Sequence, residues 1–238
     1  RDKFEALCRI IDMEEDIYGI VFCRTKVDVD RVVSHLHERA YQTDALHGDV
    51  SQSLRERILN KFKKRTINIL VATDVAARGI DVQDISHVIN YALPYDPEAY
   101  VHRIGRTGRA GKTGNAVTFI TPSEYRKLQF IQKKANTDIH RKSLPRVKDV
   151  ILLKKQRIEA YLSDLMEVAT PREYVDMANG LLANQSAESV LAALLQHTFG
   201  EELSASNYRE IDDKVVDMKG KTRLFVTMGK SDGLTKGK

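Results

Sequence analysis

Three observations predict the fold class of this 238-residue chain. In roughly the first 140 residues, short β-rich runs alternate with helix-period segments, which is typical of βαβ units and a parallel sheet with helices on both faces. Several runs are apolar throughout, as strands covered on both faces are. Beyond residue 150 the pattern is helical up to about residue 200. We therefore expect an α/β protein followed by a small all-helical domain.

Each element of the α/β part has its own signal. The strands are predicted at 18–23, 42–47, 67–73, 86–92 and 115–121. Helical periodicity follows each strand or precedes it, at 2–11, 27–40, 51–63, 97–105 and 122–135. Ser51 is expected to cap the third helix, and Pro97 suits the first turn of the fourth. Polar segments lie directly after the strands, where the ligand crevice of a parallel sheet forms.

The second part of the chain begins after a basic segment, 137–150, in which Pro145 breaks any helix. Helices follow at 152–168, 170–184 and 186–200, with Thr170 and Ser186 as expected caps. A further strand is predicted at 222–229. The resulting domains are 1–145, 146–208 and 209–238.

Composition narrows the class of protein. It is 42% hydrophobic and 30% charged, without a run of about 18 apolar residues, so we expect no membrane span and no secretion leader. The chain begins at Arg1 rather than at a methionine, as a piece of a longer protein would. Cys8 and Cys23 sit among apolar neighbours and are expected to be buried, reduced thiols of a cytoplasmic protein. The histidines are scattered and indicate no metal site, and the net charge of +5 permits a nucleic-acid partner.

One stretch, "HRIGRTGRAGKTG" at 102–114, carries the clearest chemistry. Its "GKT" imitates a phosphate-binding loop, but the required earlier glycine is replaced by Arg106, and a strand follows instead of a helix. The arginines stand among glycines that let the backbone approach a ligand. Arginine recognises phosphate oxygens in a planar, bidentate way, and it stabilises the charge that develops on a transferred γ-phosphate. We therefore expect these arginines to act as arginine fingers on a nucleotide whose main binding site lies in a part of the protein outside this sequence.

This stretch resembles motif VI of DEAD-box RNA helicases. "GIVFCRT" (19–25) resembles motif IV, "HGDVSQSLRE" (47–56) motif IVa, and "VATDVAARGID" (71–81) motif V of the same family. The four motifs occur in the family's order and cover residues 1 to about 140. The resemblance implies the second RecA-like domain of such a helicase. The first RecA-like domain, with its phosphate-binding loop, is not in this sequence.

The resemblance implies roles for the ATP-facing residues. Arg106 and Arg109 would be the arginine fingers, His102 would pair with motifs of the first domain, and Arg103 would help to hold motif VI in place. Asp81, beside Gly79, would meet the ribose. ATP with Mg²⁺ would be bound mainly by the first domain, so we expect this chain to be inactive alone.

On the RNA side, the same resemblance implies contacts with the sugar–phosphate backbone, which give sequence-independent, salt-sensitive binding. Asp74 cannot attract phosphate and is expected to organise its loop instead. Asp74 and Asp81 could equally be helix caps, and Arg55 a surface charge. The residues implied in RNA binding are Thr25, Gly48, Gln52, Arg55, Thr73, Asp74 and Arg78.

The helical part carries more apolar surface than about fifty residues can bury by themselves. It is similar in position and character to the dimerisation region of bacterial cold-shock DEAD-box helicases, which implies a homodimer through residues 150–205 and a role in stress response. The strand at 222–229 resembles the opening of the RNA-binding domain of such proteins. Two other interpretations stay open: a non-catalytic RNA-binding and dimerisation module, and a DNA helicase.

Overall fold

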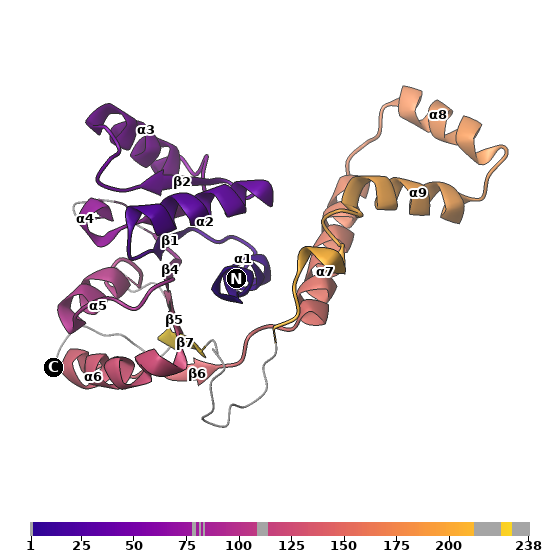
Figure 1. Cartoon of the computed structure of the whole chain (residues 1–238). Coiled ribbons are helices and arrows are strands. Elements are labelled where there is room, and N and C mark those ends of the chain that lie inside the picture. Colours follow the sequence, from indigo (N-terminus) through magenta and orange to yellow (C-terminus); the bar gives the residue numbers. More distant parts are fainter. Residues whose placement is uncertain are drawn as a thin grey trace. The chain divides into compact units, whose positions relative to one another are not determined.

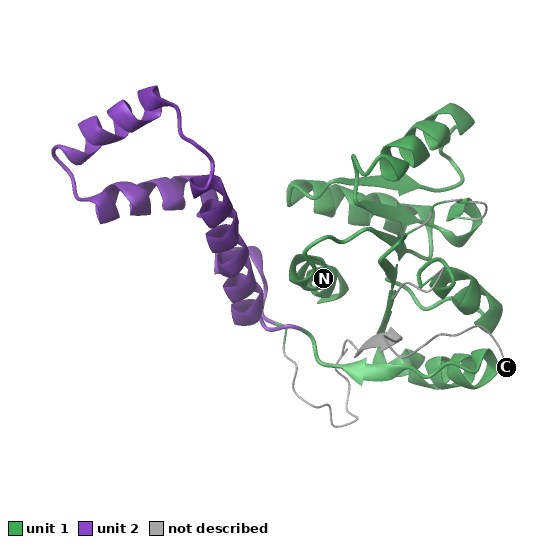
Figure 2. Cartoon of the chain, turned by 180° about the vertical axis from the view of Figure 1, so that it is seen from behind, with its two compact units in different colours: residues 1–144, 211–238 green, residues 145–210 purple. Residues whose placement is uncertain are grey.

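The computed structural model describes residues 2–77, 80, 82, 84–108 and 114–211, and the backbone of 225–229. The chain divides into two compact units, one of residues 1–144 with 211–238 and one of residues 145–210 (Figure 2). Each unit has its own architecture, and we describe them in turn.

The first unit is built on a sheet whose five parallel strands follow the order β2-β3-β1-β4-β5 (Figure 1). These strands are β1 (Gly19–Phe22), β2 (Thr43–Leu46), β3 (Ile69–Ala72), β4 (His87–Asn90) and β5 (Asn115–Ile120). Every residue of β1, β3 and β4 is buried, as the apolar runs of β1 and β3 predict. The predicted parallel α/β sheet is therefore confirmed.

Helices cover both faces of the sheet. The helices of this unit are α1 (Asp2–Met13), α2 (Lys26–Glu38), α3 (Gln52–Lys63), α4 (Asp74–Ala77), α5 (Pro97–Ile104) and α6 (Tyr125–Ala135). α1 and α2 share a core with the face that carries Val21 and Val71. α3 and α4 share another with the opposite face, around Ile20 and Leu70, and α5 and α6 cover Ala116 and Ile120 of β5. This is the doubly wound arrangement whose strand ends form a ligand crevice.

Local signals explain where the helices begin. The Ser51 hydroxyl caps α3 by accepting the N–H of Leu54, and Asp96 caps α5 with Pro97 in the first turn. α6 follows a short 3₁₀ turn, η1 (Pro122–Glu124), in which Thr121 and Glu124 form a capping box.

Two strands complete the sheet on the β5 side. β7 (Phe225–Gly229) pairs antiparallel with β5, and β6 (His140–Lys142) pairs antiparallel with β7. The strand predicted at 222–229 thus lies at 225–229, in the first unit's sheet. β6 lies within the segment expected only to separate domains, where its three exposed polar residues give no alternating pattern.

The second unit is all-helical, as predicted. It consists of α7 (Val147–Met166), α8 (Arg172–Leu182), α9 (Ala187–Phe199) and the 3₁₀ turn η2 (Ala205–Asn207). Ser186 caps α9 by accepting the N–H of Ser189. The expectation that Thr170 caps α8 is wrong, because the residue before the helix is Pro171, which has no side-chain oxygen to offer.

Candidate nucleotide and RNA interface

The loops that carry the predicted site begin at one edge of the parallel sheet. Phe22, Leu46 and Ala72 end their strands in matched register. The backbone continues this alignment, since Cys23 N–H donates to Ala72 O and Thr73 N–H donates to Leu46 O. The segments after β1, β2 and β3 therefore leave the sheet side by side, and each leads into a helix N-terminus, where backbone N–H groups favour an anion.

The predicted RNA residues occupy these helix starts. Thr25 caps α2, with its Oγ1 accepting the Asp28 N–H at 3.1 Å. Gln52 begins α3, and its amide donates to Glu56 Oε1 at 2.9 Å. Arg55, half-buried, lies one turn further along α3. Thr73 is half-buried at the entrance to α4, where its carbonyl accepts the N–H of Ala77.

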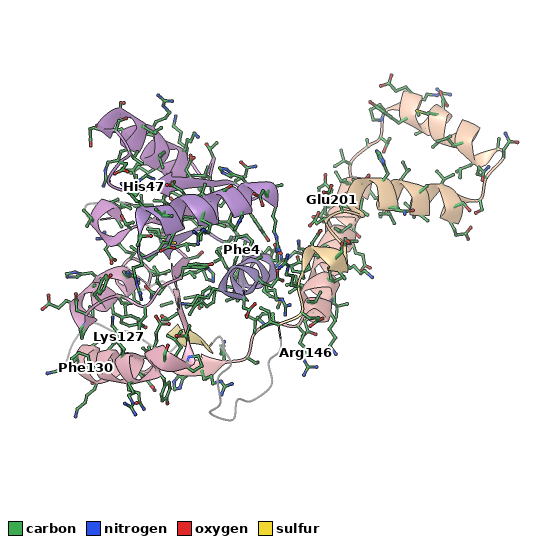
Figure 3. All side chains as sticks on the ribbon, in the orientation of Figure 1. Phe4, His47, Lys127, Phe130, Arg146 and Glu201 are labelled. Carbon is green, nitrogen blue, oxygen red and sulfur yellow. The ribbon has the colours of Figure 1, made fainter. Side chains whose placement is uncertain are left out.

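Gly48 lies in the exposed loop after β2, beside His47 (labelled in Figure 3). A Cβ at this position would meet no atom within 4 Å, and its backbone lies outside the left-handed region. Nothing within the chain therefore requires glycine at 48, and its open face is available to a ligand.

Two side-chain contacts join α2 to the loop after β2. Lys26, at the start of α2, lies 2.6 Å from Asp49, and His47 Nε2 lies 2.9 Å from Asp30 Oδ1. The hydrogen bond from Lys26 lowers the pKa of Asp49. Both pairs are open to solvent on at least one side, so they position the loops more than they stabilise the fold. Sequence reasoning missed both residues of the first pair, although Asp49 lies inside a quoted motif and Lys26 directly follows another.

The most buried part of the site is the guanidinium of Arg103 on α5, which is only 3% exposed. Its Nε and Nη2 donate to the two carboxylate oxygens of Asp74 at 2.6 and 2.8 Å. Its Nη1 donates to Asn90 Oδ1 and to Ala92 O, both at 2.8 Å, and the ring of Phe22 lies 4.9 Å away. Asn90 in turn donates to Thr118 Oγ1. This network joins the loop after β3 to α5.

The end of α5 presents the predicted ATP-facing side chains. His102 is exposed, and the half-buried Arg106 donates from Nη1 to the carbonyl of Ile80 at 2.9 Å. Arg106 is thereby placed beside the segment that follows α4. The predicted site residues Arg78, Gly79, Asp81 and Arg109 lie outside the described residues.

Two glycines of the arginine-rich stretch have a reason within the fold. Gly108 has a φ of 66°, in the left-handed region. A Cβ at Gly114 would collide with the side chain of Thr107 and the backbone of Gly108. Turn geometry at Gly108 and close packing at Gly114 therefore explain these two glycines, in place of a close approach of the backbone to a ligand. As predicted, the "GKT" that resembles the end of a phosphate-binding loop is followed by a strand, β5.

The thiols and the possible metal ligands among the described residues indicate no catalytic or metal site. Cys8 and Cys23 are buried and free, as expected, and burial raises the pKa of each thiol to about 12. Within the described residues, no group of three or more His, Cys, Asp or Glu is placed to hold a metal ion. None of the helices in the described part of the chain is long and apolar enough to cross a membrane.

Comparison with known proteins agrees with this geometry. Residues 2–111 match the Helicase conserved C-terminal domain family. The DEAD-box ATP-dependent RNA helicase CshA of Geobacillus kaustophilus is 43% identical over 197 residues, which cover 82% of this chain and 42% of that protein. The chain spans about two fifths of the length of such curated relatives.

Solved structures are similar as well. The C-terminal domain of the DEAD-box protein Dbp5 matches with a TM-score of 0.53 and 35% identity, covering 56% of this chain and 78% of that one. Saccharomyces cerevisiae Dbp5 bound to RNA and ADP BeF3 matches with a TM-score of 0.54 and 35% identity, over 56% of this chain and 36% of that one.

Proposed function

This chain belongs to the DEAD-box helicase family, and from that premise we propose that it forms the second RecA-like half of an ATP-dependent RNA helicase that separates short RNA duplexes. The observation that carries the proposal is the link between two sets of groups, in which Arg103 of α5 binds Asp74 at the start of α4. Helix starts lie after β1, β2 and β3, and His102 and Arg106 lie on the same short segment as Arg103.

On the ATP side, Arg106 and Arg109 would act as fingers on the γ-phosphate. An arginine in this role stabilises the charge on the transferred group and accelerates hydrolysis by roughly 10³–10⁵. The bond from Arg106 to Ile80 O supports the role, because Ile80 stands between Gly79 and Asp81 in the sequence. Asp81 would meet the ribose, and His102 the first domain.

ATP with Mg²⁺ would be held mainly by a first RecA-like domain, which this sequence does not contain. The sequence supports this division, because its "GKT" has Arg106 at the position where a phosphate-binding loop requires a glycine. Closure of the two domains would complete the site, and the chain alone would hydrolyse no ATP.

On the RNA side, the starts of α2, α3 and α4 would grip the sugar–phosphate backbone. Thr25, Gly48 and Gln52 are exposed there, and Arg55, Thr73 and Arg78 would complete the contacts. Asp74 would act indirectly, because both of its carboxylate oxygens are already occupied by Arg103. Backbone contacts of this kind give binding that is independent of base sequence.

The helical unit would join two copies of the chain through residues 150–205. α8 and α9 bury none of their residues, and α7 buries only Val147 and Val150. The uncovered side chains include Leu152, Tyr161, Leu165, Met166, Tyr174, Met177, Leu181, Leu191 and Leu194. An apolar surface of this extent marks an interaction site, and a closed two-fold pair is the commonest solution. Cytoplasmic location and a role in stress response remain predictions.

The same helices favour an alternative function, a non-catalytic module that binds RNA and dimerises. The two functions are separated by supplying the first RecA-like domain of a relative, either mixed with this chain or joined to it, and measuring ATP hydrolysis with and without RNA. The helicase proposal expects hydrolysis that RNA stimulates, whereas the chain alone is inactive. A combined protein that binds RNA and ATP without hydrolysis would favour the alternative.

A further inference from the structure

An exposed tyrosine lies at the sheet edge where the parallel strands end. Tyr95 lies in the loop between β4 and α5, and 71% of its surface is exposed. Two cations lie over its ring: the guanidinium carbon of Arg24 is 5.6 Å from the ring centroid, and Lys127 Nζ is 5.1 Å from it. Arg24, Tyr95 and Lys127 together are called the Tyr95 patch below.

The Tyr95 patch joins three separate segments of the chain. Arg24 comes from the loop after β1, Tyr95 from the loop after β4, and Lys127 from the first turn of α6 (labelled in Figure 3). Arg24 immediately precedes Thr25, the cap of α2. The patch therefore continues the row of helix starts proposed to grip RNA.

Two carboxylates lie near the patch. Glu124 accepts from Arg24 at 3.4 Å and lies 3.7 Å from Lys3, and it also accepts the Thr121 N–H at 2.8 Å, which secures its own turn. Asp96, next to Tyr95, is engaged in capping α5. Arg24 and Lys127 thus stand beside carboxylates that also accept backbone N–H groups.

A ring this exposed does not fill the core. Its flanking cations attract phosphate, and an aromatic face beside a positively charged groove is the arrangement on which bases of single-stranded nucleic acid stack. We propose that the Tyr95 patch is a base-stacking platform that extends the RNA path past the start of α2, with one nucleobase on the Tyr95 ring and phosphates on Arg24 and Lys127. This rests on the proposed function, in which the chain binds RNA.

The experiment measures binding of two labelled probes to the whole chain by fluorescence anisotropy. One probe is an oligouridylate, and the other is an abasic ribose–phosphate oligomer of the same length. Tyr95→Ala is expected to weaken oligouridylate binding by roughly tenfold, the effect of losing one stacked base. Tyr95→Phe, which keeps the ring, is expected to bind as the unaltered chain does.

The abasic probe separates stacking from charge. Tyr95→Ala is expected to leave its affinity unchanged, because no base is present to stack, whereas Lys127→Ala weakens both probes. Phe130→Ala, at an exposed aromatic ring of α6 outside the patch, is the control and is expected to change neither.

Three results would overturn the inference. If Tyr95→Ala binds oligouridylate normally while Arg55→Ala binds it weakly, RNA binding stands but the platform does not, and the patch is left to a protein partner. If Tyr95→Ala weakens both probes equally, the ring serves the cations rather than a base. If the unaltered chain binds neither probe, the proposed function fails together with the inference.

Discussion

Arg103 holds both carboxylate oxygens of Asp74, through Nε at 2.6 Å and Nη2 at 2.8 Å, in a bidentate pair that spans the loop after β3 and helix α5. The ion pair thus connects the segment proposed to bind RNA with the helix proposed to face ATP. Asn90, from the strand between them, occupies the remaining nitrogen of the guanidinium. A shift of either element would have to carry the other with it.

The first prediction concerns this pair. Asp74→Ala leaves the buried guanidinium of Arg103 without its carboxylate and should lower the free energy of unfolding by roughly 3 kcal/mol, the lower end for breaking a buried pair, since Asp74 itself is about a third exposed. Urea denaturation measures it. Asp16→Ala, which breaks an exposed pair with Arg65, should cost less than about 1 kcal/mol. Equal losses in the two variants would contradict the buried role.

The second prediction contrasts two glycines. Gly48→Ala should leave the melting temperature unchanged, because its Cβ enters open space, yet weaken RNA binding by about tenfold by keeping the backbone away from a phosphate. Gly114→Ala should destabilise the fold by roughly 1–3 kcal/mol, because its Cβ collides with Thr107 and Gly108. Thermal melting and RNA titration separate the effects. If Gly48→Ala binds RNA with normal affinity, the loop after β2 does not contact the RNA backbone.

The third prediction is a pH dependence. Burial lowers the pKa of His87 below its ordinary value of 6.5, against the opposing pull of Glu14. The unfolded chain therefore binds a proton that the folded chain resists, so this group's contribution to stability falls as pH drops below about 6.5. Denaturation between about pH 7.5 and pH 5 should show a shallower loss in His87→Gln than in the unaltered chain. His140→Gln, at an exposed histidine, is the control, and a shallower loss there too would refute the assignment.

The fourth prediction concerns assembly. Light scattering over a concentration series should give the mass of a dimer, because the helical unit leaves its leucines uncovered. The double variant Leu191→Glu with Leu194→Glu should be monomeric, and Gln196→Glu, at a polar position of the same helix, should stay dimeric. A monomeric mass for the unaltered chain at every concentration would remove the proposed pairing through residues 150–205.

Much of the fold could be predicted because its signals are local. Buried parallel strands are apolar at every position, as β1 and β3 are, and a capping residue such as Ser51 acts within one turn. The three-residue β6 was missed because its polar side chains carry no alternation. Thr170 was misplaced because Pro171 can stand either inside a helix or at its boundary.

The roles of the candidate site residues stay predictions, and the partners of their side chains could not be predicted from the sequence. Arg103 and Asp74 are 29 positions apart, and Asn90 lies on a separate strand between them in the sequence, so the sequence does not say which groups meet. The pair of Lys26 and Asp49 depends on the strand order, which places β1 and β2 on either side of β3. The roles of Gly108 and Gly114 could not be predicted, because they depend on a backbone angle and on close contacts that only the structure provides.

The central claim, that this chain completes an ATP-hydrolysing site with an arginine finger, is tested most directly by Arg106→Ala in the combined protein that carries a relative's first RecA-like domain. The measurement is the single-turnover rate of ATP hydrolysis at saturating RNA. The account predicts a loss of roughly 10³-fold or more with ATP binding retained, whereas Arg31→Ala, at an exposed position of α2, keeps the full rate. Hydrolysis by Arg106→Ala at the unaltered rate would contradict the claim.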